Sequence, residues 1–306
     1  MLHRSSYLLA SIVLFMPLNS KVSRRNAYQF PDISDSEIVA FRERVFAFFA
    51  LHARDFPWRH LTDRYAVMVS EVMLQQTQAD RVVSRFTDWL IRFPDVQSLA
   101  ASSRKDLLSA WNGLGYNSRA IRMQQAAIKI IECFDGQVPA DPVRLATLPG
   151  IGAYASRSIP AFADNLDVAA VDTNVRRIIH HAFAISESAS NSQIQLFAER
   201  LLPAGQSRDW HNALMDYGAL CLTSRATGIR PKSRQKPFRH SRRWYRGQLL
   251  KELLAVESLL LEELETKYAA APWAIRGIID EMSAEGLLDP VCRDYPEGPE
   301  IVRIGR

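Results

Sequence analysis

Apolar residues recur at helical spacing along almost the whole chain, and this periodicity constrains the fold more than any other feature. From Ser34 onward one amphipathic segment follows another, and no stretch alternates apolar and polar residues before the last 20 positions. Ser34 and Glu37 have the spacing of a capping box, and Ser103 with Asp106 marks a second helix start. We therefore predict an all-α body, with helices that include residues 65–79, 119–133, 143–147 and 154–162.

A basic stripe follows this body. Between Tyr217 and Lys251 there are ten Lys or Arg residues and no Asp or Glu, whereas the rest of the chain has 28 basic and 33 acidic residues. This asymmetry, with aromatic residues interleaved among the cations, indicates a polyanionic partner such as nucleic acid. A solvated linker is the alternative interpretation.

Three short helical segments and a terminal β-hairpin follow the stripe. The hairpin is expected from Leu287–Asp289, a Pro-Glu-Gly-Pro turn and Ile301–Ile304. Together they predict a small winged-helix-like domain. The expected organisation is an N-terminal extension at 1–30, a helical body at 31–221, a basic loop at 222–240 and the winged-helix-like domain at 241–306.

The N-terminal extension contains an apolar run from Tyr7 to Leu18, which is too short to span a bilayer. The residues after it form a poor signal-peptidase site, so we interpret the run as a misassigned start rather than an export signal. The three cysteines lie far apart, which argues against a disulfide framework. We expect a cytoplasmic, nucleoid-associated protein with no membrane attachment.

The segment Leu148-Pro149-Gly150-Ile151-Gly152 connects two expected helices. Glycines at 150 and 152 permit a tight turn with exposed backbone N–H groups, and such groups beside a helix N-terminus bind anions. The functional interpretation is a helix-hairpin-helix that holds a DNA phosphate without reading sequence. The alternative is a plain turn between helices.

Two carboxylates are candidates for acid–base chemistry. Glu71 lies among apolar neighbours on a helix, where burial would raise its pKa and make it a general acid. Asp172 precedes a helix and would stay ionised opposite Glu71, as glycosidic cleavage requires. The alternatives are a solvent-facing Glu71 and an ordinary N-cap at Asp172.

Taken together, the motifs resemble the A/G-specific adenine DNA glycosylases of the helix-hairpin-helix glycosylase superfamily. The resemblance runs from about Asp35 to Cys221. Its most specific part is the string Ser-Glu-Val-Met-Leu-Gln-Gln-Thr at 70–77. The other matching segments are Phe56–Arg59, Gly113–Tyr116, Leu148–Gly152, Val171–Arg177 and Met215–Cys221.

This resemblance implies the fold of that superfamily and a base-flipping mechanism. Glu71 matches the acid that protonates the adenine, and Asp172 matches the carboxylate that stabilises the sugar cation. Asn174 and Tyr154 match residues that help to hold this site. In the bifunctional members a lysine stands where this chain has Tyr154, so the resemblance implies a monofunctional enzyme.

The resemblance also assigns contacts with a flipped adenine and with double-stranded DNA. Trp58 and Arg59 match the adenine pocket. DNA contacts are expected at Gln76 and Tyr116, which match residues that wedge into the base stack, and at Gly150, Gly152, Arg230, Lys232, Arg234 and Lys236. We expect a monomer that acts on adenine opposite 8-oxoguanine or guanine. The alternatives are a T·G mismatch glycosylase, which also carries tyrosine at position 154, and a DNA-binding protein that no longer cleaves.

The chain departs from the family in two places. Most members bind a four-iron, four-sulfur cluster through four cysteines. Cys221 matches the first ligand, but the others fall on Gly228, Pro231 and Pro237, so we expect no cluster. Residues 241–306 are too few for the Nudix-like domain that reads 8-oxoguanine in many members, which leaves recognition of the opposite base open.

Overall fold

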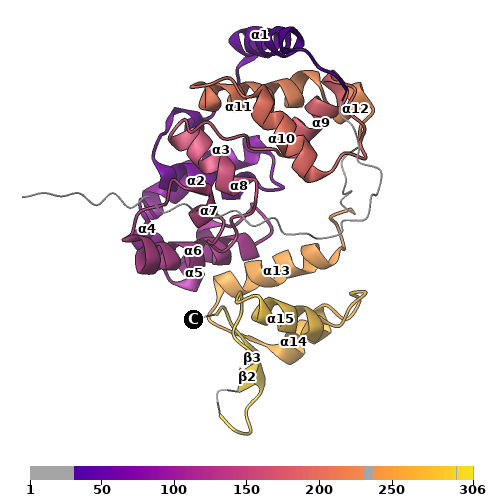
Figure 1. Ribbon diagram of the computed structural model, residues 1–306. Helices are drawn as coiled ribbons and strands as arrows, with labels where there is room; N and C mark the ends of the chain where they lie inside the picture. Colours follow the sequence, from indigo (N-terminus) through magenta and orange to yellow (C-terminus); the bar gives the residue numbers. More distant parts are fainter. Residues whose placement is uncertain (1–30, 231–236, 294, 306) are drawn as a thin grey trace, which may run out of the picture. The chain divides into compact units, whose positions relative to one another are not determined.

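The expected helical body forms in the computed structural model, which describes residues 31–230, 237–293 and 295–305 (Figure 1). The extension at 1–30, and with it the prediction of a misassigned start, lies outside the described residues. Every regular element within residues 31–230 is helical. These elements are α1 (Asp35–His52), η1 (Pro57–His60), α2 (Arg64–Leu74), α3 (Ala79–Arg92), α4 (Val96–Ala100), α5 (Arg104–Ala110), α6 (Ser118–Phe134), α7 (Pro142–Leu145), α8 (Ala155–Ala163), α9 (Thr173–Ala182), α10 (Asn191–Leu201), α11 (Ser207–Asp216), η2 (Tyr217–Cys221) and α12 (Ser224–Thr227).

Local side chains fix several helix starts. Ser34 Oγ accepts a hydrogen bond from the Glu37 amide at 3.3 Å, and the Glu37 carboxylate accepts one from the Ser34 amide at 2.8 Å. Ser103 caps α5 through the Asp106 amide at 3.0 Å. These bonds satisfy backbone N–H groups that the first helical turn leaves without partners. The capping predictions at Ser34 and Ser103 are confirmed.

The prediction of one helix over residues 65–79 is wrong. α2 ends at Leu74 and α3 begins at Ala79, with Gln76 in the left-handed region at φ 57°. No glycine or proline lies at this break. Instead, the Arg119 guanidinium from α6 donates to the carbonyl oxygens of Val72, Met73 and Gln75, so a tertiary contact holds the turn.

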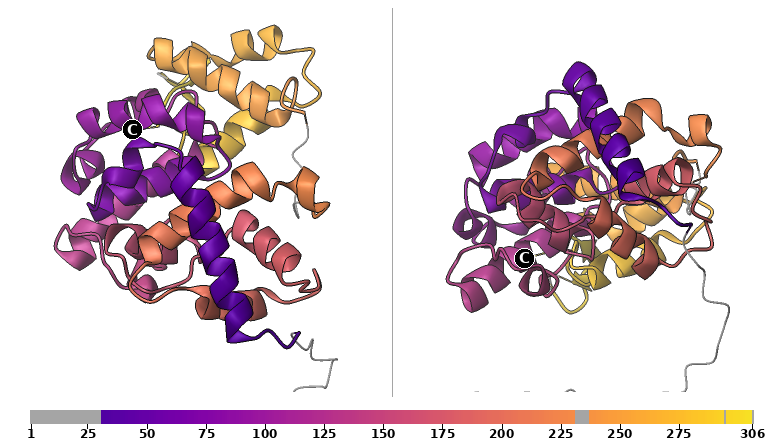
Figure 2. Two further views of the ribbon diagram at one scale, coloured as in Figure 1. Left: turned by 90° about the horizontal axis from the view of Figure 1, so that it is seen from above. Right: turned by 45° about the horizontal axis from the view of Figure 1, so that its top comes forward.

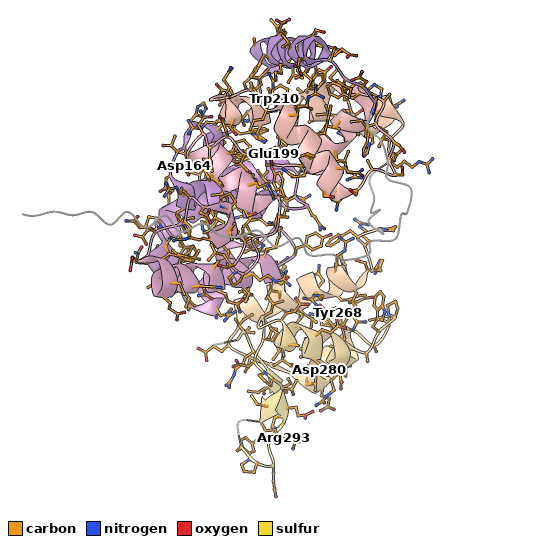
Figure 3. The ribbon with its side chains drawn as sticks, in the orientation of Figure 1. Asp164, Glu199, Trp210, Tyr268, Asp280 and Arg293 are labelled. Carbon is orange, nitrogen blue, oxygen red and sulfur yellow. The ribbon has the colours of Figure 1, made fainter. Side chains whose placement is uncertain are left out.

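α2 is buried on all sides, because Tyr65 to Met73 are buried without interruption and the helix contacts α3, α6 and α8. A second group of helices is built on α11, which contacts α1, α8 and α9. Figure 2 shows α1 lying across this group. Trp210, labelled in Figure 3, is fully buried there and lies edge-on to Phe41 at a centroid distance of 6.0 Å.

The C-terminal module comprises three helices and a small antiparallel sheet. Its elements, in chain order, are α13 (Arg242–Ala255), β1 (Leu259–Leu260), α14 (Leu261–Lys267), α15 (Ile275–Ala284), β2 (Cys292–Arg293) and β3 (Glu300–Val302). The strand order is β1-β3-β2, with Leu259 opposite Val302 and Cys292 opposite Ile301. This is the helix–strand–helix–helix–strand–strand arrangement of a winged helix. The domain boundaries expected at residues 221/222 and 240/241 stay a prediction.

Two details of this module differ from expectation. The first hairpin arm is Cys292–Arg293 rather than Leu287–Asp289, since Leu288 makes only an isolated bridge with Ile304. β1 was not expected, because two residues are too few to show alternation. Among the described residues, no helix combines the length and apolar character needed to cross a membrane.

Candidate active site

Glu71 lies on the buried helix α2 and has only 7% of its surface exposed. The Ser158 hydroxyl, from the facing helix α8, donates a hydrogen bond to Glu71 Oε2. Burial raises the pKa of Glu71 to about 7, and the Asp172 charge adds to the effect, whereas hydrogen bonds from Ser158 and Tyr154 lower it. This carboxyl therefore retains its proton up to neutral pH. The solvent-facing alternative for Glu71 is excluded.

Tyr154 stands at the N-terminal end of α8, immediately after the glycine hairpin. Its half-buried ring directs the hydroxyl to Glu71. Burial, with the charges of Glu71 and Asp172, raises the pKa of Tyr154 well above its usual range. The phenol therefore stays protonated and acts as a hydrogen-bond donor beside the acid.

Asp172 caps α9 and faces the same centre. Its carboxylate accepts from the Val175 amide at 2.7 Å and from Asn174 Nδ2 at 3.0 Å. Burial raises the pKa of Asp172, while these donors and the Arg177 charge oppose that rise. The N-cap interpretation of Asp172 is confirmed. The cap fixes a carboxylate whose charge acts on Glu71 and Tyr154, and its catalytic role stays a prediction.

Arg177 extends this arrangement and was given no role in the sequence prediction. Its Nη2 donates to Asn174 Oδ1 at 2.8 Å and to the Gly218 carbonyl oxygen at 2.7 Å, and its Nε donates to the Leu222 carbonyl oxygen at 2.6 Å. These bonds orient the Asn174 amide so that its nitrogen faces Asp172. The only sequence signal is that Arg177 lies one helical turn after Asn174.

Glu71 also lines a small cavity of about 20 Å³. Trp58 and Arg59, which match the adenine pocket of the family, line this cavity, and their role stays a prediction. Among the lining residues that the sequence prediction missed are Phe162, Arg208 and Asn212. Trp58 is fixed by stacking on Phe56 at a centroid distance of 4.8 Å.

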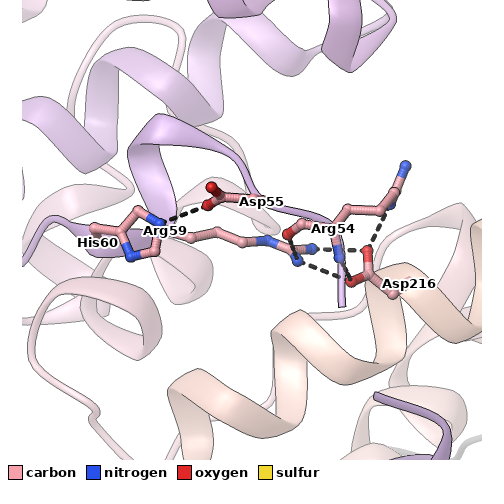
Figure 4. A network of polar contacts seen from close by, with 5 residues as sticks. All are labelled: Arg54, Asp55, Arg59, His60 and Asp216. Carbon is pink, nitrogen blue, oxygen red and sulfur yellow. Dashed lines mark hydrogen bonds and ion pairs between the residues drawn. The ribbon is translucent and has the colours of Figure 1, made fainter. Parts of the chain in front are cut away.

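Arg59 is held in place by an ion pair (Figure 4). Its Nη1 and Nη2 donate to the two carboxylate oxygens of Asp216, each at 2.8 Å, and Nη1 also donates to the Arg54 carbonyl oxygen. Arg54 Nε donates to the same carboxylate at 2.7 Å. Two guanidinium groups sharing one fully buried carboxylate tie the η1 segment to the end of α11.

The glycine hairpin presents its backbone to solvent. Gly150 and Gly152 are exposed while Ile151 between them is buried. Gly150 has φ 82°, and a Cβ there would lie 3.0 Å from Arg122 Cβ, so a side chain is strained at this position. Gly152 has no such constraint. The hairpin therefore exposes both glycines close to Tyr154, and phosphate binding by its amides stays a prediction.

The two turns that carry Gln76 and Tyr116 are joined by one buried side chain. Both residues have positive φ, at 57° and 48°. Arg119 is only 7% exposed, and its guanidinium donates to both turns. The sequence prediction gave Arg119 no role. Its seven acceptors are Val72 O, Met73 O, Gln75 O, Thr77 Oγ1, Leu114 O, Gly115 O and Tyr116 O.

The basic stripe is described only in part. Arg230 is exposed and borders a small hollow beside α9. Lys232, Arg234 and Lys236 lie outside the described residues, as does Pro231.

The residues at the expected cluster positions do not fit a four-cysteine cluster. Cys221 is an exposed free thiol, but Gly228 and Pro237 have no side-chain donor. Gly228 instead ends α12 at φ 73°. Within the described part of the chain, no three His, Cys, Asp or Glu side chains gather as metal ligands would.

The chain is similar to a family of DNA repair proteins and to adenine DNA glycosylases. Residues 69–204 match the family described as HhH-GPD superfamily base excision DNA repair protein. The chain is 34% identical over 233 residues to the adenine DNA glycosylase of Mus musculus, covering 72% of this chain and 45% of that protein. It is 40% identical over 188 residues to the adenine DNA glycosylase of Mycolicibacterium smegmatis, covering 60% and 64%.

Among solved structures, a thermostable thymine-DNA glycosylase superposes with a TM-score of 0.60 at 26% identity, covering 65% of this chain and 91% of that one. The chain thus spans about half to two thirds of the two curated relatives and most of this structural neighbour. The expected helix-hairpin-helix glycosylase fold is confirmed.

Proposed function

We propose that this chain, whose residues 69–204 match the HhH-GPD superfamily of base excision DNA repair proteins, is a monofunctional glycosylase that removes adenine mispaired with 8-oxoguanine or guanine. The observation that carries the proposal is the buried Glu71, whose pKa is raised to about 7 beside the carboxylate of Asp172. A carboxylic acid that keeps its proton near neutrality, next to a second carboxylate, is the arrangement that N-glycosidic cleavage uses.

In this mechanism the target adenosine leaves the duplex, at an unstacking cost of a few kcal/mol. The base enters at the cavity bordered by Trp58 and Asn212, which must widen to admit a purine. Glu71 gives its proton to the adenine as the bond from the base nitrogen to C1′ breaks. Asp172 stabilises the positive charge that develops on the sugar, and water then adds to C1′.

Tyr154 supports the monofunctional assignment. A phenol cannot form the Schiff base that a lysine forms with C1′. Here it donates a hydrogen bond to Glu71 instead. The reaction would thus end at an abasic site with an intact DNA strand.

The proposed partner is double-stranded DNA. The hairpin amides at Gly150 and Gly152 would bind a phosphate, and the turns of Gln76 and Tyr116 would contact the stacked bases. We further propose that the protein acts as a monomer and binds no iron–sulfur cluster. Iron analysis of the purified protein tests the last point, since stoichiometric iron would contradict it.

The function is tested with duplexes that contain A·8-oxoG, A·G or T·G, treated with alkali after incubation so that abasic sites become strand breaks. We expect breaks at the adenine strand of the first two duplexes and none without alkali. Cleavage of T·G alone would favour a thymine glycosylase. Binding without cleavage of any duplex would favour a DNA-binding protein that has lost its activity.

A further inference from the structure

The C-terminal module reaches the turn that carries Tyr116. Arg243, on the first turn of α13, donates from Nη1 to the Tyr116 hydroxyl at 2.6 Å. Its guanidinium carbon also lies 5.5 Å from the centroid of the tyrosine ring. Arg119 lies 5.8 Å from the same centroid, so two guanidinium groups flank this ring.

This contact belongs to a fixed interface between the module and the body. Arg104 Nη1 donates to the Gly286 carbonyl oxygen at 2.9 Å, and Lys105 Nζ donates to the Val256 carbonyl oxygen at 3.2 Å. Buried apolar residues of α2–α8 and of the module form one continuous cluster. The position of Arg243 is therefore set by packing.

The neighbouring arginines of α13 form ion pairs within the C-terminal module. Arg242 pairs with Glu281 on α15 at 2.6 Å, and Arg246 pairs with Glu285, the C-cap residue of α15. These two guanidinium groups fasten α13 to its own module. Arg243 is directed to the body instead, at the position where the turn of Tyr116 meets α6.

The segments expected to contact DNA converge around the first turns of α6. Arg119 joins the turns of Gln76 and Tyr116, and one helical turn later Arg122 packs against Gly150 of the hairpin. Arg243 adds a cation from the C-terminal module to this same surface.

We propose that Arg243 is a DNA contact, and that α13 extends the DNA-binding surface next to Tyr116. The inference rests on the proposed function. A guanidinium has only donors, so its ligand is an acceptor oxygen of the DNA, on a phosphate or on the edge of the opposite base.

The test measures dissociation constants for A·8-oxoG, A·G and matched A·T duplexes, in a Glu71→Gln background so that no base is released. Arg243→Ala should weaken binding to A·8-oxoG and A·G about tenfold. Arg276→Ala is the matched control, because its guanidinium pairs with Glu300 within the same module. The control should change affinity less than twofold.

The affinity loss on each duplex and the salt dependence of binding together distinguish a contact with a phosphate oxygen from a contact with a base. A phosphate contact predicts an equal loss on all three duplexes and a salt slope that falls by about 0.9. A base contact predicts a larger loss opposite 8-oxoguanine or guanine than on the matched duplex, with the salt slope little changed. Either pattern supports a DNA contact.

Tyr116→Phe distinguishes a DNA contact from a docking contact. It removes the hydroxyl that Arg243 binds and retains the ring. If Arg243 only docks the module, Arg243→Ala and Tyr116→Phe should have equal effects, and that equality or unchanged affinity would overturn the inference. Base release by the unmodified enzyme is measured separately, so failure of the proposed function is recognised independently.

Discussion

The hydroxyl of Ser158 donates a hydrogen bond to Oε2 of Glu71 from the helix that begins just after Tyr154. Ser158 and Tyr154 are four positions apart, so their side chains lie on the same face of this segment and both contact the acid. The two hydroxyl groups favour the ionised carboxylate, whereas burial favours the protonated one. Their balance leaves the pKa of Glu71 near neutrality.

Base release should therefore fall as pH rises through about 7, because catalysis needs the protonated acid. The single-turnover rate, measured at saturating protein between pH 5.5 and 9, gives this profile. Glu71→Gln should abolish base release and keep duplex affinity within a few-fold. A rate that is constant across this pH range, or near-normal activity in Glu71→Gln, would show that another group supplies the proton.

Ser158→Ala should move the basic limb of that profile to higher pH. The hydrogen bond from Ser158 stabilises the ionised carboxylate of Glu71, so its loss should raise the pKa of this group. A hydrogen bond to a charged group is worth about 1.5 kcal/mol, which corresponds to a shift of about one pH unit. Ser156→Ala is the matched control, since its hydroxyl donates to the Ala153 carbonyl oxygen and does not contact Glu71. An unshifted limb in Ser158→Ala would mean that this serine has only a packing role.

The sequence predicted those features that depend on neighbouring residues. The capping box of Ser34 and Glu37 and the cap at Ser103 form within four residues of chain, so their spacing is a sufficient signal. The glycine hairpin is local in the same sense, because Gly150 adopts a backbone conformation that other residues resist.

The residues around Glu71 do not decide whether its side chain is buried or faces solvent. Its burial depends on Ser158 and Tyr154, which lie more than 80 positions later in the chain. The resemblance to the adenine DNA glycosylases favoured the catalytic acid over a solvent-facing Glu71. The break after Leu74 is also tertiary, since Arg119 holds the turn from another helix. For the same reason no local pattern indicated that Arg119, Arg177 or Asp216 would organise the site.

No covalent adduct with DNA should be trapped efficiently by borohydride, because Tyr154 has no amine that can attack C1′. The measurement is gel electrophoresis of enzyme and A·8-oxoG duplex after borohydride treatment. Tyr154→Lys should gain weak trapping and lose most base release. Strong trapping by the unmodified protein would contradict the monofunctional assignment and point to a lysine elsewhere.

Arg119→Met should destabilise the protein by about 3 kcal/mol or more, since several partly or fully buried carbonyl oxygens lose their donor. Urea denaturation measures the difference. Arg92→Met is the control, because its exposed ion pair with Asp106 should be worth about 1 kcal/mol or less. Equal effects of the two substitutions would refute the role of Arg119 in joining the turns of Gln76 and Tyr116.

The basic stripe should contribute affinity without contributing to the chemical step. Replacing Arg230, Lys232, Arg234 and Lys236 with alanine should weaken binding to all duplexes by similar factors. Each lost phosphate contact should lower the log–log salt slope by about 0.9. Single-turnover base release at saturating protein should change little, because Glu71 and Asp172 lie on other segments. If the quadruple variant keeps both its affinity and its salt slope, the stripe is a solvated linker to the C-terminal module and binds no DNA.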